Sequence, residues 1–344
     1  MKNGIGFIGS VIVDVVSEVL EPGNLVYSDG ARYLLGDDFE TERIEYSLGG
    51  MATNNSVNLA KMGAKYPIRV IGKIGTDDNG RRIRDTFRKN GISDEYLIET
   101  SEHPTSSTQV IYIKVSDEII NRTFRYYFGA MGSFTLDDID YSVLEGLKIA
   151  MVGYCLLVPH FDTVDSEYGS AIGRILKKLR DMGILTCIDF VTPKREKWWK
   201  FKRIQKTLQW VDILSIGEDQ AEGITGIADE KTAAKTLVEK YGVNTAVVHC
   251  GDKGANYLYS RSTGLITQPI FKVPPEEYAG NVGAGDAFAA GLLHGIHQEW
   301  DEKKSLQYAT AAASISLGSL TCTDAMQNEN YILDYMNTRP VYKL

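Results

Sequence analysis

Residues 281–296 read NVGAGDAFAAGLLHGI, which combines three small residues, one carboxylate and an apolar helical run. Gly283, Ala284 and Gly285 place little or no side chain where the chain turns into a helix, so backbone N–H groups are free to face a ligand. An anion there meets unsatisfied donors and the positive end of the helix dipole. Asp286 either caps the helix or accepts the proton of an attacking hydroxyl beside a bound phosphate. The segment therefore indicates a plain helix start or a phosphoryl-transfer site.

A second glycine-rich segment, SLGGMATNNSVNLAKMGA at residues 47–64, joins a Gly-Gly turn to another helical pattern. Gly49 and Gly50 precede apolar residues at helical spacing. Asn54 and Asn55 lie near the start of this helix, where an amide can hold sugar hydroxyls. Helix capping explains one asparagine at such a place, but it explains two less well.

Composition narrows the class of partner. The chain has 344 residues, a net charge of −8, and 43% hydrophobic and 24% charged residues, which predicts one large core with room for a smaller appendage. It contains no block of five or more Lys or Arg, so we expect a small-molecule partner and no nucleic acid. No run of 18 apolar residues occurs, and Asp14 interrupts the apolar N-terminal run, so we expect a cytoplasmic protein with no membrane contact.

Three other patterns are expected to be structural. The four cysteines form no CxxC pair and are predicted to be buried free thiols. The five histidines, His249 among them, share no metal-type spacing with carboxylates or cysteines, and packing is their expected role. Gly4, Gly6 and Gly9 spell GxGxxG, but no strand fits before them and the following run is β-branched, so a dinucleotide loop is rejected.

The elements that must position these residues follow from periodicity. Short β-branched runs alternate with helical patterns over most of the chain, beginning with a strand predicted over 66–75 and a helix over 78–91. Strands that are apolar on both faces and separated by helices predict a mainly parallel sheet covered on each side. This is the doubly wound α/β class.

Two regions break the alternation, at about residues 15–47 and 107–130, because they show strand patterns with no helix between them. We expect them to form one small sheet beside the main domain, a discontinuous β lid that excludes water from a site. Residues 1–14, 48–106 and 131–344 are then the α/β core that binds nucleotide and substrate.

The two glycine-rich signatures together resemble those of the ribokinase-like, or PfkB, family of carbohydrate and nucleoside kinases. The N-terminal signature matches at Gly49, Gly50, Asn54 and Gly63, and the GAGD signature matches at residues 283–286. Between them, IGKIGTDDNG, VDILSIGEDQAEGITG and VVHCGDKGA are similar to family segments in the same order. The resemblance covers almost the whole chain.

The resemblance implies a ribokinase-like three-layer α/β/α fold with a mainly parallel sheet and a small β-sheet lid. It implies a sugar kinase that uses ATP and Mg²⁺, with a monovalent cation as a further candidate and a homodimer through the lid. By position, Asp286 would be the general base, and Gly283, Ala284 and Gly285 would form a backbone anion hole.

The remaining site residues are also assigned by position in the resemblance. The residues expected to bind the acceptor are Asp14, Gly49, Gly50 and Asn54. The residues expected along the nucleotide are Gly251 and Gly254, by position, and Asn281, which departs from the family pattern but can still donate a hydrogen bond.

The chain departs from the family pattern in three places. Gly280 and Asn281 stand where the family usually has Asp-Thr ahead of GAGD, and the family's D-x-N-x-R keeps Asp189 but has Val191 in place of Asn. The third departure is the family's NxxE, which is tied to magnesium and phosphate.

That motif falls on Gly217 and Gln220, neither of which carries a charge. Glu218 is the neighbouring carboxylate expected to substitute as a metal ligand. Magnesium keeps mostly water and phosphate oxygens as ligands, so such a loss can be tolerated. We predict an active kinase with altered metal or donor behaviour.

Two alternatives remain open: an adenosine or other nucleoside kinase, and a nucleotide-binding regulatory protein without catalysis. A nucleoside base needs an aromatic slot, whereas a sugar needs polar edges, and the lid offers both. Its aromatic residues are Tyr33, Phe39, Tyr126, Tyr127 and Phe128. Its polar residues are Arg32, Asn121, Arg122 and Arg125. The sequence leaves the acceptor, the donor preference and the oligomeric state undetermined.

Overall fold

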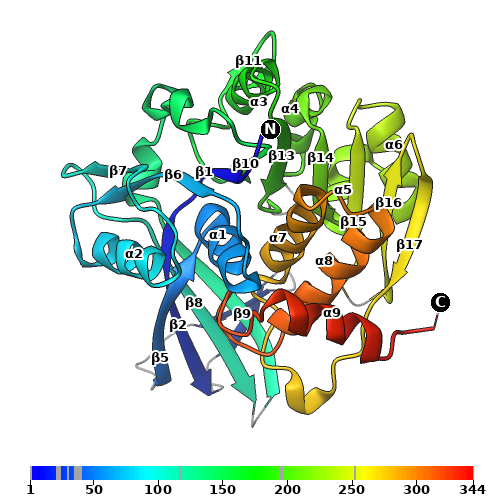
Figure 1. The fold of residues 1–344 in the computed structure, drawn as a ribbon. Coiled ribbons are helices and arrows are strands. Elements are labelled where there is room, and N and C mark those ends of the chain that lie inside the picture. The colour runs from blue at the N-terminus through cyan, green and yellow to red at the C-terminus, as the bar shows by residue number, and fades with distance from the viewer. Residues whose placement is uncertain are drawn as a thin grey trace.

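A large sheet between two layers of helices forms the body of the molecule (Figure 1). The computed structural model describes residues 2–20, 25–28, 31–34, 41–115, 118–193, 197–251 and 253–343. Within these residues the large sheet has the strand order β17-β16-β15-β14-β13-β10-β1-β6-β7. Its strands are β1 (Ile5–Gly9), β6 (Ile68–Gly75), β7 (Leu97–Thr100), β10 (Ile149–Cys155), β13 (Leu185–Phe190), β14 (Ile213–Gly217), β15 (Thr245–His249), β16 (Ala255–Ser260) and β17 (Gly264–Pro269).

The strands from β7 to β15 run parallel, and β16 and β17 complete one edge in antiparallel pairing. Successive side chains of a strand point to opposite faces. In β1, accordingly, Ile5 and Phe7 join the core on one face while Ile8 joins the core on the other. This two-sided burial explains the apolar runs of the central strands. The mixed α/β class predicted from the sequence is confirmed.

Helices cover both faces of this sheet (Figure 1). One layer consists of α1 (Met51–Met62), α2 (Asp78–Lys89), α7 (Ala284–His297), α8 (Glu302–Ser316) and α9 (Glu329–Thr338). The other layer consists of α3 (Ala171–Asp181), α4 (Trp199–Ile204), α5 (Glu218–Thr225) and α6 (Glu230–Glu239). Short 3-10 turns lie at Gly129–Ser133, Leu136–Asp138, Tyr141–Leu144, Thr207–Trp210 and Pro275–Glu277. A minor antiparallel pair is formed by β11 (Val164–Asp165) and β12 (Gly169–Ser170).

A smaller sheet draws strands from both regions that interrupted the alternation. Its order is β5-β2-β8-β9, formed by β2 (Ile12–Leu20), β5 (Thr41–Gly49), β8 (Ser107–Val115) and β9 (Glu118–Tyr127). Its inner face packs against the body through Val16, Val110 and Tyr112, which contact Val282 and Leu320. Val282 directly precedes the GAGD segment, so the small sheet rests beside that segment.

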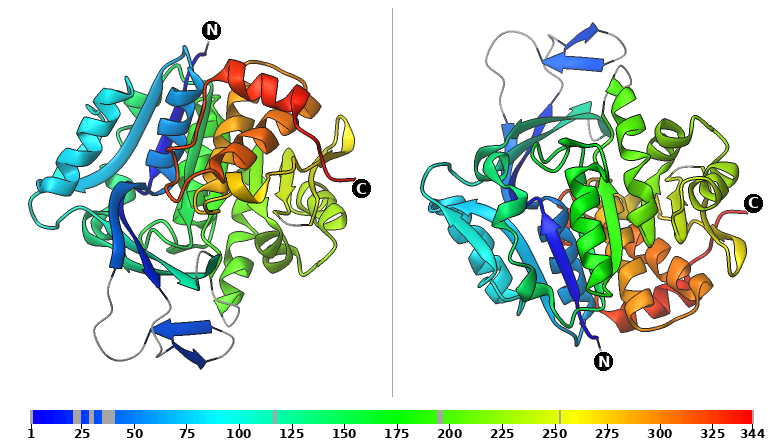
Figure 2. Two further views of the ribbon diagram at one scale, coloured as in Figure 1. Left: turned by 90° about the horizontal axis from the view of Figure 1, so that it is seen from below. Right: turned by 90° about the horizontal axis from the view of Figure 1, so that it is seen from above.

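An antiparallel pair, β3 (Leu25–Ser28) and β4 (Ala31–Leu34), stands out from the body beyond the small sheet (Figure 2). Phe39, named above among the lid aromatics, lies outside the described residues, as do the side chains of Arg32, Tyr33, Asn121 and Arg122. The division of the chain into core and lid at the boundaries given above stays a prediction.

The local predictions made for helix ends and for the first glycine motif agree with the structure. α1 ends at Gly63, whose φ of 87° is the left-handed conformation that glycine adopts without penalty. GxGxxG is followed by strand β2 and not by a helix, which confirms that it is no dinucleotide loop. Among the described residues, no helix combines the length and the apolar character that crossing a bilayer requires.

Candidate active site

The N-terminal end of α7 is shaped by Gly283. Its φ of 82° lies in the left-handed region, and a Cβ atom on it would come within 2.6 Å of the Cα of Cys322, so no other residue fits. The helix begins at the next residue, which leaves first-turn N–H groups without partners in their own helix. Asp286 lies in this first turn, but no side-chain hydrogen bond caps the helix. Asp286 is therefore not a capping residue.

The Asp286 carboxylate is buried and held by donors from two other elements. From α1, Asn54 Nδ2 donates to Oδ2 at 2.8 Å and Asn55 Nδ2 donates to Oδ1 at 3.2 Å. From the end of β10, the Tyr154 hydroxyl lies 2.8 Å from both oxygens. Burial raises the pKa of Asp286 to about 6, and the hydrogen bonds from Asn54, Tyr154 and Asn55 oppose that rise. A carboxylate with this pKa is mostly ionised at pH 7 yet takes up a proton readily.

Asp14 lies opposite, on β2 of the small sheet. It is 7% exposed, and burial, followed by repulsion from Asp286, raises its pKa to about 7. A Cβ atom on Gly49 would overlap the Asp14 carboxylate, at 2.1 Å from Oδ1, so glycine at this position makes room for the aspartate. Gly50, at a φ of 87°, would bring a Cβ atom within 2.6 Å of the Ser10 carbonyl oxygen. The Gly-Gly pair thus lets β5 and α1 approach the first strands.

A cavity of about 300 Å³ lies between the small sheet and the body, and we call it the acceptor cavity. Carboxylates line it from three elements: Asp14 from β2, Asp189 from β13 and Asp286 from α7. Burial, followed by repulsion from Asp286, raises the pKa of Asp189 well above its usual value. Phe124 and Tyr126 of β9 add an aromatic wall, with ring centroids 6.2 Å apart and the rings 10° from parallel.

A second cavity of about 470 Å³ lies on the other side of the α7 terminus, and we call it the donor cavity. Of the residues expected along the nucleotide, Gly251 and Asn281 line it, together with Ala284 and Gly285. Gly254 is not among its lining residues, and the Gly254 carbonyl accepts a hydrogen bond from the Ile270 N–H. Three residues line both cavities: His249, Asn281 and Gly285.

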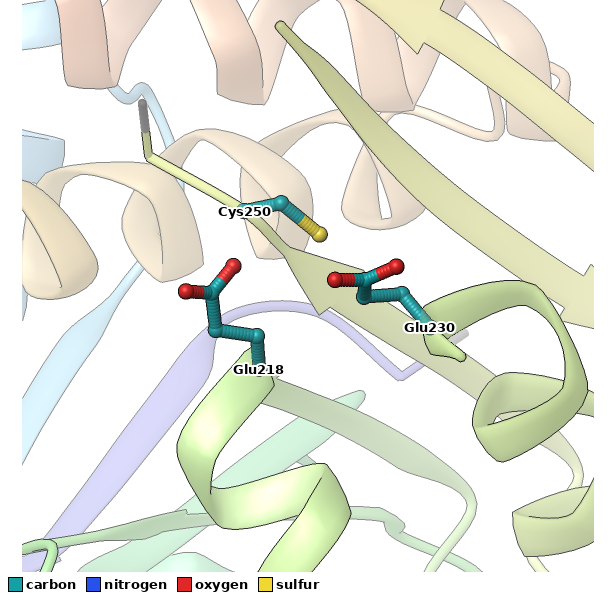
Figure 3. A group of neighbouring side chains, drawn as sticks. All are labelled: Glu218, Glu230 and Cys250. Atoms are coloured by element: carbon teal, nitrogen blue, oxygen red, sulfur yellow. The ribbon is translucent and has the colours of Figure 1, made fainter. Parts of the chain in front are cut away.

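Glu218, the carboxylate expected to hold metal, belongs to a different cluster. It begins α5 and lies near Glu230 of α6 and Cys250 after β15, with one ligand-type atom of each within 4.8 Å of the others (Figure 3). Lys253 Nζ lies 3.4 Å from Glu218 and 2.6 Å from Glu230, so one cation already pairs with both carboxylates. Glu218 lines neither cavity.

The sequence reasoning predicted none of the three side-chain contacts of Asp286, since Asn54 was expected to bind the acceptor. Asn55 was noticed beside Asn54, and the two adjacent amides were a usable signal. Tyr154 belongs to no motif. It contacts Asp286 only because the end of β10 meets α7 in the folded chain, and the two residues are 132 positions apart in sequence. Sequence reasoning also assigned His249 to packing, whereas the structure places it on the wall between the two cavities.

A helix N-terminus that faces a cavity, with a buried carboxylate beside it, is a site suited to phosphoryl transfer to a hydroxyl group. Comparison with known proteins also indicates a kinase. Residues 7–329 match the pfkB family of carbohydrate kinases. The chain is 26% identical over 314 residues to a 5-dehydro-2-deoxygluconokinase of Geobacillus kaustophilus, covering 87% of this chain and 88% of that one.

Solved structures share the fold. A ribokinase of Arabidopsis thaliana, complexed with ribose and ATP, matches with a TM-score of 0.74 at 21% identity, covering 98% of this chain and 99% of that one. A putative ribokinase II of E. coli, in complex with ATP and Mg²⁺, matches with a TM-score of 0.74 at 15% identity, covering 97% and 98%. The fold is thus that of the ribokinase-like kinases. The chain belongs to the pfkB family of carbohydrate kinases, and it is a sugar kinase.

Proposed function

We propose that this sugar kinase transfers the terminal phosphoryl group of ATP to a hydroxyl of a small sugar or sugar derivative, with Asp286 as the general base. The observation that carries the proposal is the Asp286 carboxylate, which faces the acceptor cavity from the first turn of α7 and is held by Asn54, Asn55 and Tyr154. Its donors fix the carboxylate in one orientation, which general-base catalysis requires.

In the reaction, the acceptor O–H proton passes to the Asp286 carboxylate while the acceptor oxygen forms a bond to the terminal phosphorus. The bond from that phosphorus to the bridging oxygen breaks, and ADP leaves with the electron pair. The N–H groups of the first turn of α7 stabilise the negative charge that builds up on the phosphoryl oxygens. Such donors are each worth about 3 kcal/mol in a transition state.

The donor cavity fits the remainder of the nucleotide. It opens on the same helix terminus, and Gly251, Ala284 and Gly285 keep its wall free of long side chains. Magnesium, when bound, would neutralise phosphate charge, and it takes most of its ligands from phosphate and water. Asp189 lines the acceptor cavity and Glu218 lies 3.4 Å from Lys253 Nζ, so we propose that phosphate and water supply most of the ion's ligands.

The chemistry of the acceptor cavity favours a neutral acceptor rich in hydroxyl groups. Asp14, Asp189 and Asp286 can exchange hydrogen bonds with hydroxyls, and the ionised Asp286 disfavours an anion beside it. Phe124 and Tyr126 can pack on the apolar face of a sugar ring. Some relatives are named 5-dehydro-2-deoxygluconokinase, so the sugar acid 5-dehydro-2-deoxygluconate is the acceptor with which neutral sugars should be compared. We propose that neutral sugars are better acceptors than this compound.

Further proposals concern the small sheet, the oligomeric state, a monovalent cation and the cellular location. We propose that the small sheet, which packs beside Val282, acts as a lid that excludes water, and that a homodimer forms through it. Activation by a monovalent cation and a cytoplasmic location are carried over from the family resemblance and the composition.

An ADP-release screen tests the proposal. The panel contains neutral sugars, polyols, nucleosides, sugar phosphates and sugar acids that include 5-dehydro-2-deoxygluconate, each with ATP and Mg²⁺. We expect at least one neutral sugar to raise ADP release above the acceptor-free rate. A panel in which no acceptor does so contradicts the proposed function, and a panel led by a sugar acid contradicts the proposed acceptor class.

A further inference from the structure

Side chains of the protein itself already fill the hydrogen-bonding positions of the Asp286 carboxylate. An ionised carboxylate offers about four lone pairs, two on each oxygen. Oδ1 accepts from Asn55 Nδ2 at 3.2 Å and from the Tyr154 hydroxyl at 2.8 Å. Oδ2 accepts from Asn54 Nδ2 at 2.8 Å and from the same Tyr154 hydroxyl at 2.8 Å. An acceptor hydroxyl can therefore bond to this carboxylate only if one of these contacts is given up.

The three donors differ in where they lie. Asn55 is buried, lines neither cavity, and its Nδ2 also donates to the Met51 carbonyl at 2.9 Å. Asn54 lines the acceptor cavity but contacts Oδ2 alone. Tyr154 lines the same cavity, is half-buried, and contacts both oxygens. Tyr154 is thus the donor that joins both oxygens of Asp286 to the acceptor cavity.

The Tyr154 hydroxyl shares one hydrogen between two oxygens. It can release one oxygen and keep the other, whereas either asparagine would lose its contact with the carboxylate altogether. The ring packs against the apolar cores on both faces of the large sheet, which holds it in place while the hydroxyl changes partners. Burial raises the pKa of Tyr154 well above its usual value, so the hydroxyl keeps its proton at pH 7 and stays a donor.

Water is the competitor of every acceptor in this site. At about 300 Å³ the acceptor cavity has room for water when no acceptor is bound. Water activated by Asp286 beside a bound triphosphate would hydrolyse ATP to ADP and phosphate. An acceptor differs from water because it also contacts Asp14, Phe124 and Tyr126, and this binding energy can offset the loss of one hydrogen bond to Asp286.

We propose that Tyr154 selects an acceptor over water, because its hydroxyl occupies both oxygens of Asp286 and releases one of them only to an acceptor bound in the acceptor cavity. This assignment rests on the proposed function. During transfer, the acceptor proton passes to the released oxygen, while Tyr154 keeps its own proton and donates to the other oxygen. Tyr154 acts through Asp286 and is therefore a positioning residue.

ADP release with ATP and Mg²⁺ alone tests the proposal. Tyr154→Phe removes the hydroxyl and keeps the ring, Asn55→Leu removes a donor that lines neither cavity, and Tyr331→Phe alters an exposed tyrosine as the matched control. A hydrogen bond to a charged group is worth a factor of about ten or more, so we expect Tyr154→Phe to raise acceptor-free ADP release about tenfold. We expect no rise in Asn55→Leu and the wild-type rate in Tyr331→Phe.

Combining Tyr154→Phe with Asp286→Asn should remove the increase, because water then meets no base. Urea unfolding checks that each variant is folded. An acceptor-free rate in folded Tyr154→Phe that is unchanged, or that falls in proportion to the acceptor-dependent rate, would overturn the assignment. An increase that persists without the Asp286 carboxylate would overturn it too.

A measurement on the wild-type protein tests the same assignment without relying on a variant. The probe is an analogue of the best neutral sugar from the acceptor screen that lacks the phosphorylated hydroxyl. It fills the cavity without offering an O–H to Asp286, so we expect ADP release to stay at the acceptor-free rate. An analogue that raises ADP release would overturn the assignment and leave the proposed function intact. Wild-type protein that responds to no acceptor in the screen would overturn both.

Discussion

The two ends of α7 both carry buried polar side chains, but their surroundings differ. At the N-terminal end, Asp286 faces a cavity that also contains Asp14 and Asp189, and burial raises the pKa of all three carboxyl groups. Like charges in a low-dielectric site destabilise the ionised state. Ionisation of the carboxyl groups at this end of the helix therefore destabilises the folded state.

At the C-terminal end, the polar groups bond to one another and to the backbone. The Tyr66 hydroxyl lies 2.9 Å from His294 Nδ1, and His294 Nε2 lies 2.8 Å from the Glu329 carboxylate of α9. His297 stacks on Tyr66 at 3.7 Å between centroids, and its Nε2 accepts from the Gly4 N–H at 2.9 Å. These contacts fasten α7 to α9 and to the start of β1.

The comparison teaches that one helix serves two purposes at its ends. Perturbed carboxyl groups facing a cavity mark a functional site. Polar groups that bond mostly to other groups of the fold mark a structural site, although His297 Nδ1 has no partner within the described residues. Substitutions at the first end should change the rate, and substitutions at the second end should change stability.

The largest expected effect is that of Asp286→Asn, which removes the proton acceptor and leaves a side chain of similar size. We expect kcat to fall about 10³-fold, within the usual range for general-base catalysis. Steady-state ADP release with the best acceptor measures it. An Asp286→Asn variant with wild-type kcat would show that the carboxylate is not the base.

The stability of the same variant provides its control. The pKa of Asp286 is raised in the folded state, so its favourable contribution is complete below the unfolded pKa of 3.8 and is lost as the pH rises through about 6. Asparagine has no such dependence. The Tm of Asp286→Asn relative to wild type should thus be higher at pH 8 than at pH 5, which shows that inactivity does not come from unfolding.

A smaller effect is expected from pH on the wild-type enzyme. Since Asp286 must be ionised to accept a proton and its pKa is about 6, kcat/KM should fall about tenfold per pH unit below that value. Initial rates between pH 5 and pH 8 measure the profile, with circular dichroism to exclude acid unfolding. A rate that stays constant down to pH 5 would be inconsistent with a base of this pKa.

The smallest effect concerns the C-terminal end. Tyr66→Phe removes the hydroxyl that lies against His294 Nδ1 and leaves a buried nitrogen unpaired, which costs about 1–3 kcal/mol of unfolding free energy. We expect kcat to stay within about twofold of wild type. The matched control is Tyr331→Phe, because Tyr331 is 47% exposed and should lose little stability. Urea unfolding measures both variants, and equal stabilities would show that the pairing contributes nothing.

Much of the fold could be predicted from the sequence because it depends on local patterns. The strand at Ile68–Gly75 and the helix at Asp78–Lys89 fall where apolar periodicity places them, since side-chain spacing alone decides which face is buried. The GAGD turn is local too: glycine at position 283 adopts a positive φ that other residues avoid. These features were determined by the sequence itself.

Only the tertiary structure decided what Asp286 does. Whether it caps α7 depends on where its carboxylate points, and the answer comes from Asn54, 232 residues earlier, and from Tyr154, 132 residues earlier. His249 was expected only to pack in the core, but it lines both cavities. The sequence could not show this, because β15 and α7 meet only in the folded chain. Spacing in sequence fixes local conformation, whereas the solvation and charge of a side chain are set by neighbours that only folding brings together.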